Sequence, residues 1–145
     1  MIALIQRVSE AAVRVDGETV GRIEAGLLAL IGVERHDDER NADRMLERLL
    51  GNRVFGDDQG RMNLALNDTA GGLLLVPQFT LAADTRKGTR PGFSTAAAPE
   101  HARALFNYLL EQARCAHPTV ASGRFGADMD VSLTNQGPVT FRLEA

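Results

Sequence analysis

The sequence predicts an α+β fold in which a curved mixed or antiparallel β-sheet, or a partial β-barrel, carries two main helices packed outside. Segments with strand character come in runs, two segments carry an apolar stripe at helical spacing, and strands and helices do not alternate regularly. The 145 residues, of which 44% are hydrophobic and 24% charged, suit one globular domain covering residues 1–145.

The first strands follow from apolar runs and turn residues. Ile2–Val8 predicts a strand, Val13–Val15 alternates, and Asp16–Gly17 is a hairpin-turn signal before a return strand over Thr19–Ile23. Leu27–Val33 is a continuous apolar run that is too short for a helix, so it predicts a buried strand.

The two helices are predicted from their buried faces and their ends. Asp37 and Asp38 precede the first helix, because carboxylates favour helix N-termini, and Gly51 is its expected end. The second helix begins near Pro99, a residue suited to the first turn. The apolar stripes are Ala42, Met45, Leu46, Leu49 and Leu50, and then Ala102, Leu105, Phe106, Leu109, Leu110 and Ala113.

The other expected strands are short. They lie near Val54 and Leu64 on either side of the turn Asp57–Gly60, over Leu73–Val76, and over Met129–Leu133 and Val139–Leu143, which Thr134–Pro138 joins.

Composition limits the possible partners. A formal net charge of −3 argues against broad binding of duplex nucleic acid but permits a small RNA contact, such as the single-stranded end of a tRNA. Cys115 is the single cysteine, which excludes an intrachain disulfide and suits a reducing compartment. The first residues do not resemble a signal peptide, and the longest apolar run is too short for a membrane span, so we expect a cytoplasmic protein with no membrane partner.

Common catalytic patterns are missing from the sequence. His36, His101 and His117 do not have metal-ligand spacing, and one cysteine cannot form a zinc knuckle. There is no Gly-x-Ser-x-Gly elbow and no phosphate-binding loop. We therefore expect no metal and no cofactor.

Two segments are unusual. In Val76–Thr80, Pro77 cannot donate to a strand ladder, so either an edge strand with a polar face or the end of regular pairing is expected there. In Asn135–Thr140, the choice is between a tight hairpin turn and a functional Gly137–Pro138 bond. An X-Pro bond can be cis at a cost of about 0.5–1 kcal/mol.

At these two segments the chain resembles the bacterial D-aminoacyl-tRNA deacylase family. The family motifs Ser-Gln-x-Thr and Asn-x-Gly-Pro-Val-Thr appear here as Pro77–Thr80 and Asn135–Thr140. The resemblance extends over the whole chain, including Arg90–Pro91 and Gly123–Phe125. There is one departure: Pro77 stands where the family usually has serine, and proline offers neither a hydroxyl nor an N–H.

The resemblance implies a homodimer with active sites at the subunit interface. Gly137 and Pro138 would form a cis peptide that enters the partner's pocket and binds the substrate α-ammonium through its carbonyls. An L side chain would clash there, whereas D-aminoacyl and glycyl esters would be accepted. The implied substrate-binding set is Gly137, Pro138, Asn135, Met129, Phe125 and Arg7, with Arg7 bracing the Gly-Pro loop.

The implied catalytic residues are Thr80, Gln78 and Phe79, and the implied substrate is the tRNA 3′ acceptor end carrying a D-amino acid. Backbone N–H groups near Phe79 and Thr80 would stabilise the oxyanion. Thr80 would act as a nucleophile or as a group that orients the substrate, and we favour orientation because no base is visible.

Other interpretations stay open. Arg86, Lys87 and Arg90 form either an RNA contact or a solvated basic loop. The chain as a whole is alternatively a non-catalytic module that binds RNA ends, a structural dimer in which both motifs are turns, or a hydrolase of free D-amino-acid esters or peptides.

Overall fold

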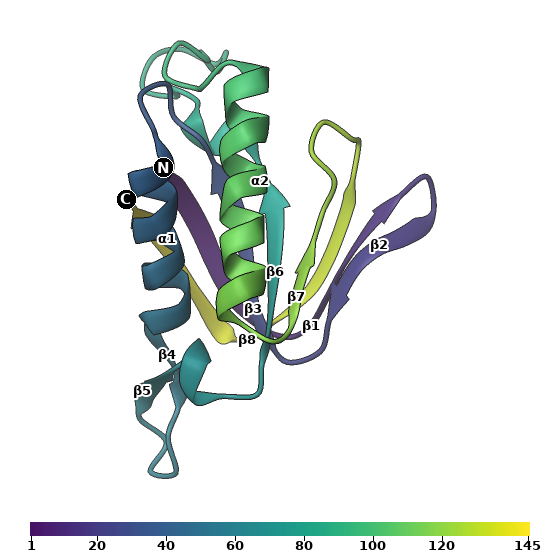
Figure 1. Ribbon diagram of the computed structural model, residues 1–145, viewed down its shortest axis with the longest axis vertical. Coiled ribbons are helices and arrows are strands. Elements are labelled where there is room, and N and C mark those ends of the chain that lie inside the picture. The colour runs from purple at the N-terminus through teal and green to yellow at the C-terminus, as the bar shows by residue number, and fades with distance from the viewer.

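The computed structural model describes residues 1–145 and is built around a curved, mixed six-stranded sheet (Figure 1). The strand order is β2-β1-β3-β6-β7, and β8 pairs with β1. The pairs β3–β6 and β6–β7 are parallel, whereas all pairs made by β1 are antiparallel. The strands of the sheet are β1 Ile2–Val15, β2 Glu18–Ile23, β3 Gly26–Gly32, β6 Gly72–Pro77, β7 Val120–Ser122 and β8 Asp130–Glu144.

The sheet curls because β1 changes its neighbour along its length. Its first half, to Val8, pairs with β3, and its second half, from Ala11, pairs with β2, while β8 runs along its other edge. The free end of the curl returns close to β7. A Cβ on Gly21 of β2 would lie 2.4 Å from the Ser122 carbonyl oxygen, so this approach requires glycine. The result is a partial barrel.

Two helices, α1 (Glu39–Gly51) and α2 (Pro99–Ala116), lie side by side over one face of the sheet (Figure 1). Asp38 caps α1, since its carboxylate accepts the Arg40 N–H while Asn41 accepts the Asp38 N–H. Pro99 occupies the first position of α2. The chain also contains a small hairpin of β4 (Arg53–Gly56) and β5 (Met62–Ala65), and two 3₁₀ turns, η1 (Leu66–Asp68) and η2 (Phe79–Ala82).

Strand alternation divides the buried side chains between two layers. Leu73 and Leu75 of β6 face the helices, whereas Leu74 and Val76 face the inside of the curl. The helix-facing layer takes both predicted apolar stripes, and every residue of those stripes is buried. No helix has the length and apolar character that crossing a membrane would require.

The predicted α+β class, the partial barrel and the two outer helices are confirmed. Two local predictions are wrong. Ile2–Val8 and Val13–Val15, predicted as separate strands, belong to one long strand. No strand was predicted at Val120–Ser122, where three residues give too short a pattern. Of the two interpretations of Pro77, the end of regular pairing is confirmed, because Pro77 ends β6 opposite Ile31 and lies beyond the stretch Leu73–Leu75 that pairs with β7.

The hairpin interpretation of Thr134–Pro138 is also wrong. Val131–Leu133 and Thr140–Leu143 do not pair with each other, because both pair with β1 in one direction. Between them the register shifts near Val8, so the chain bulges outward and then resumes the same ladder. The Gly-Pro segment is therefore a bulge on a sheet strand.

Candidate active site

A cavity of about 460 Å³ opens at the carboxyl end of β6, beside the first turn of α2. Ligands commonly bind outside the carboxyl ends of parallel strands. Four of the sequence-predicted site residues line this cavity together: Gln78, Phe79, Phe125 and Met129. The rest of the lining is Val76, Pro77, Ala97, Pro99, Ala102, Gly126, Ala127, Asp128 and Val131.

The chain turns sharply where β6 ends. The Gln78 N–H still donates to the Ile31 carbonyl, at 2.7 Å, and η2 begins at the next residue. The side-chain amide Nε2 of Gln78 donates to Oγ1 of the exposed Thr80 at 2.5 Å. Thr80 is thereby held by a neighbour that cannot take up its proton, and its own hydroxyl hydrogen is available to another acceptor.

The opposite wall is fixed from two sides. Phe125 packs against Phe106 of α2, with 6.4 Å between ring centroids, and the Arg103 guanidinium lies 5.2 Å from its ring centroid. The Met129 sulfur accepts the Arg124 N–H. A Cβ on Gly123 would lie only 2.8 Å from that sulfur, so a larger residue there would require the Met129 side chain to shift.

The Gly137–Pro138 corner is exposed and has a cis peptide bond. Arg7 braces it, because its Nε donates to the Gln136 carbonyl at 3.0 Å and its Nη1 donates to the Val54 carbonyl at 2.8 Å.

Asn135 also binds this segment. Its Oδ1 accepts the Val139 N–H at 2.8 Å, and its Nδ2 donates to the Thr140 hydroxyl at 2.8 Å. Val139, the residue after Pro138, is buried, so the corner is held by hydrogen bonds from two side chains and by one buried neighbour.

The structure does not bring the predicted set into one site within the chain. Gln78, Phe79, Phe125 and Met129 line the cavity, whereas Thr80, Gly137, Pro138, Asn135 and Arg7 do not. The chain therefore presents two separate parts: a cavity, with Thr80 following its lining residues Gln78 and Phe79, and an exposed corner braced by hydrogen bonds.

The predicted basic residues lie on a loop beside the cavity. Asp84 and Gly92 close this loop with a two-way backbone bridge, at 2.7 and 2.9 Å. Asp84 also binds Arg86 at 2.7 Å, and this hydrogen bond lowers the pKa of the carboxyl group far below its usual range. Lys87 and Arg90 are exposed on the same loop.

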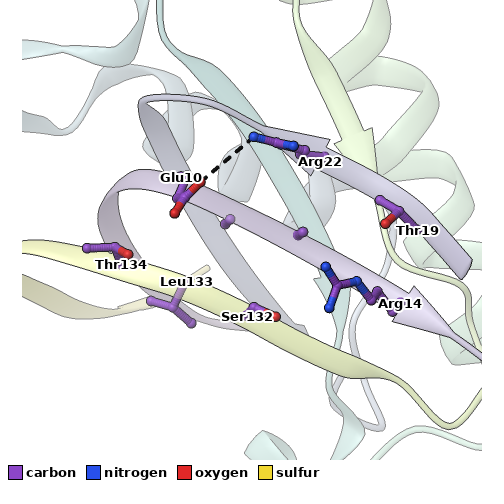
Figure 2. A pocket seen from close by; sticks show the side chains of 9 residues that line it. Glu10, Arg14, Thr19, Arg22, Ser132, Leu133 and Thr134 are labelled. Carbon is purple, nitrogen blue, oxygen red and sulfur yellow. Dashed lines mark ion pairs between the residues drawn. The ribbon is translucent and has the colours of Figure 1, made fainter. Parts of the chain in front are cut away.

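A second hollow, of about 230 Å³, lies over β1, β2 and β8 (Figure 2). Arg22 points toward Glu10 there, with 3.8 Å between the charged groups, and also pairs with Glu24 at 3.2 Å. None of the predicted site residues lines this groove. Arg22 is paired with carboxylates, whereas Arg14, the other arginine of the lining, makes no ion pair.

The chemistry that the cavity can supply is limited by its lining. Asp128 is the one ionisable residue in it, and no histidine or cysteine contributes. His101 and His117 are occupied elsewhere, with each Nε2 at 2.8 Å from a backbone carbonyl oxygen. Such a site is suited to positioning and hydrogen bonding to a reactive substrate, with little acid–base assistance.

Sequence reasoning missed Gly123, Asp128 and the small wall residues Ala97 and Ala102 as parts of the site. Ala102 was assigned to the core stripe of α2, where it is indeed buried. A cavity-facing alanine at the start of a helix has no sequence signal that separates it from a core alanine. For Gly123, the only signal was its place before Arg124–Phe125.

The chain matches a known protein family over nearly its whole length. The family described as D-Tyr-tRNA(Tyr) deacylase matches residues 4–144. A D-aminoacyl-tRNA deacylase of Janthinobacterium sp. (strain Marseille) is 65% identical over 144 residues, which cover 99% of this chain and 97% of the relative. A protein of the same name from Thioalkalivibrio sulfidiphilus is 67% identical with the same coverage.

Two solved structures are similar in fold. One, named c-Myc DNA Unwinding Element Binding Protein, has a TM-score of 0.95 and 36% identity and covers 100% of this chain and 99% of its own. The other, described as a probable eukaryotic D-amino acid tRNA deacylase, has a TM-score of 0.86 over 99% of this chain and 98% of its own. At 17% identity, the second likeness concerns the fold alone.

Proposed function

The chain belongs to the D-Tyr-tRNA(Tyr) deacylase family, and on that premise we propose that it hydrolyses the ester bond of D-aminoacyl-tRNA, releasing tRNA and the D-amino acid. The observation that carries this proposal is that the chain has both a cavity lined by Gln78 and Phe79 and, apart from it, a braced, exposed Gly137–Pro138 corner. Each is incomplete alone, and together they would make a site that reads the handedness of a substrate.

The corner of one subunit would act in the cavity of the other subunit. In a homodimer, Gly137 and Pro138 of one subunit would enter the cavity of the other and present their carbonyls to the substrate α-ammonium, which has three donors and no acceptor. With the ammonium and the ester both held, a D side chain points outward and an L side chain meets rigid backbone. The braces from Arg7 and Asn135 support this role, because exclusion by a clash requires a backbone that does not yield.

The reaction needs little chemical assistance. An ester to ribose is activated relative to an amide, which fits a cavity with one ionisable lining residue. Backbone N–H groups of Phe79 and Thr80 would stabilise the oxyanion, and the ribose 2′-hydroxyl would position the attacking water. The Pro77 substitution supplies no hydroxyl or N–H to this scheme, so any contact that the family serine makes is absent here.

We assign Thr80 an orienting role. Its hydroxyl accepts from the Gln78 amide, and an amide is not a base that would activate it as a nucleophile. Thr80→Ser should then retain most activity and Thr80→Ala should lose part of it, with no acyl-enzyme trapped in either case. A covalent aminoacyl adduct on Thr80 would reverse the assignment.

The primary experiment compares D-tyrosyl-tRNA, L-tyrosyl-tRNA, glycyl-tRNA and a free D-tyrosine ester at equal concentration, following loss of the ester. We expect rapid cleavage of the D-tyrosyl and measurable cleavage of the glycyl substrate, with the L-substrate resistant. Equal rates for D and L would refute the proposal. Binding without turnover would favour an RNA-end-binding module, and equal cleavage of the free ester would favour a general esterase.

Mixing two impaired variants tests the cross-subunit arrangement. Thr80→Ala impairs the segment that follows Gln78 and Phe79, and Pro138→Ala impairs the corner, so a mixed dimer has one site with both parts intact. Random exchange of subunits between the two variants should restore about a quarter of the wild-type number of active sites. If both parts act within one subunit, mixing will restore nothing.

A further inference from the structure

Two exposed aromatic rings stand at the mouth of the cavity. Phe79 is 57% exposed and Phe93 is 45% exposed, and their ring centroids lie 5.2 Å apart with a tilt of 43°. Only Met62 and Phe141 are comparably exposed among the large hydrophobic side chains. Two exposed rings in contact make a contiguous apolar surface, and such surfaces can mark interaction sites.

The position of Phe93 is fixed by the backbone. It directly follows Gly92, whose two-way bridge to Asp84 closes the basic loop. The Phe93 carbonyl then accepts the Ala96 N–H at 3.1 Å. The chain thus holds this ring against Phe79 instead of burying it.

The surroundings of the two rings carry positive charge. The loop from Asp84 to Gly92 contains three cations, Arg86, Lys87 and Arg90, and a single carboxylate, which pairs with Arg86. Two cations are left for an outside anion, although the whole chain has a net charge of −3. Aromatic rings beside unpaired cations are the usual means of binding single-stranded nucleic acid, because bases stack on the rings and phosphates meet the cations.

We propose that Phe79 and Phe93 form a stacking platform for the base of the nucleotide next to the one that carries the ester, with Lys87 and Arg90 meeting the adjoining phosphates. Phe79 lines the cavity and Phe93 does not, so the platform extends outward from the place where the ester-bearing nucleotide would sit. This inference rests on the proposed function and adds the direction in which the RNA leaves the pocket.

The test compares three D-tyrosyl esters: on adenosine, on the dinucleotide cytidylyl-adenosine, and on the same dinucleotide lacking the cytosine base. For the wild type, we expect KM to be about tenfold lower for the full dinucleotide than for the other two, as stacking of one base allows. We call this tenfold decrease in KM the gain. Phe93→Leu keeps an apolar contact with Phe79 but has no ring face, so it should lose the gain, while kcat and the preference for D over L are unchanged.

Phe93→Trp should keep the gain and also report on it directly. The chain contains no tryptophan, so the new indole is the only one, and its emission should be quenched by a non-hydrolysable D-tyrosyl-amide analogue of the dinucleotide but not by the abasic analogue. Met62→Ala, at an equally exposed apolar side chain in the β4–β5 hairpin, serves as the control and should keep the gain.

An undiminished gain in Phe93→Leu would overturn the platform, as would equal quenching by the abasic analogue. If Phe93→Leu instead lowers the dimer fraction in sedimentation and leaves the gain intact, the rings are a subunit contact and the proposal is wrong. Failure of the proposed function is distinguishable, because the wild type would then cleave the L-tyrosyl counterparts of the three esters as fast as the D-tyrosyl esters themselves.

Discussion

Replacing Arg7 by lysine tests whether the Gly-Pro corner must be held rigidly. The Arg7 guanidinium reaches two carbonyl oxygens in different parts of the chain, Gln136 at 3.0 Å and Val54 at 2.8 Å. A lysine ammonium is a compact point charge on a flexible stem and does not reproduce this planar fork. We expect Arg7→Lys to keep one of the two contacts and to loosen the corner.

The expected loss follows from the contact that disappears. A hydrogen bond to a charged group contributes about 1.5–3 kcal/mol. Because Arg7 is only half-buried, solvent screening reduces this to about 1–2 kcal/mol. If that free energy keeps Gly137–Pro138 oriented, the equilibrium constant between the oriented and the released corner falls by roughly tenfold, at 1.4 kcal/mol per factor of ten. The value of kcat/KM for D-tyrosyl-tRNA should fall, by up to about tenfold.

The assay measures kcat/KM for the D- and L-substrates, together with urea denaturation. Arg53→Lys is the matched control, since Arg53 is exposed and its only side-chain contact is to Asn63 at 3.4 Å. The control should retain wild-type activity. An Arg7→Lys protein with unchanged kcat/KM and unchanged D/L ratio would show that the brace does not matter to selectivity, and the reasoning would fail.

Two further predictions concern the scaffold. The buried Met1 ammonium binds the Asp37 carboxylate at 2.6 Å, and the same carboxylate accepts the Glu34 N–H; Asp37→Ala should therefore lower the free energy of unfolding by about 3–5 kcal/mol, seen as a lower urea midpoint at unchanged slope. The hydrogen bond from the Tyr108 hydroxyl to Asp43, 2.9 Å long, raises the pKa of Tyr108. This hydrogen bond stabilises the folded state fully below the unfolded-state pKa of about 10. The stabilisation is lost as the pH rises through the higher pKa that Tyr108 has in the folded state. Because Tyr108 is the only tyrosine, an ultraviolet absorbance titration reads its pKa, which should fall in Asp43→Asn; coincident curves would contradict the assignment.

Much of the fold could be predicted because it depends on local patterns. The stripe containing Met45 and Leu49 predicted α1 and its buried face, and Asp38 predicted its start. Leu73–Val76 predicted a fully buried strand, which is what β6 is. What failed had a weak pattern or depended on distant partners: β7 is three residues long, and β1 looked interrupted because Ser9 and Glu10 lie where it changes neighbour from β3 to β2.

The candidate site was predictable in its residues and not in its arrangement. Gln78 and Phe79 were named from one motif, and Gly137 and Pro138 from the other. Gln78 and Phe79 line a cavity, whereas Gly137 and Pro138 stand apart from it. This arrangement depends on where the end of β6 and the bulge of β8 fall in the sheet. The pairing of Phe93 with Phe79 also escaped sequence reasoning, since the loop between them is closed by backbone bonds that leave no residue pattern.

By itself, the sequence determined the fold class, the two helices and the family, because apolar periodicity and short motifs are properties of neighbouring residues. The tertiary structure alone decided that Arg7 reaches both Gln136 and Val54, that the Thr134–Pro138 segment bulges from a strand instead of turning a hairpin, and that the corner and the cavity lie apart in one chain. The physical reason is that β-sheet pairing joins segments far apart in the chain, and which partner a strand finds is a property of the whole packed sheet.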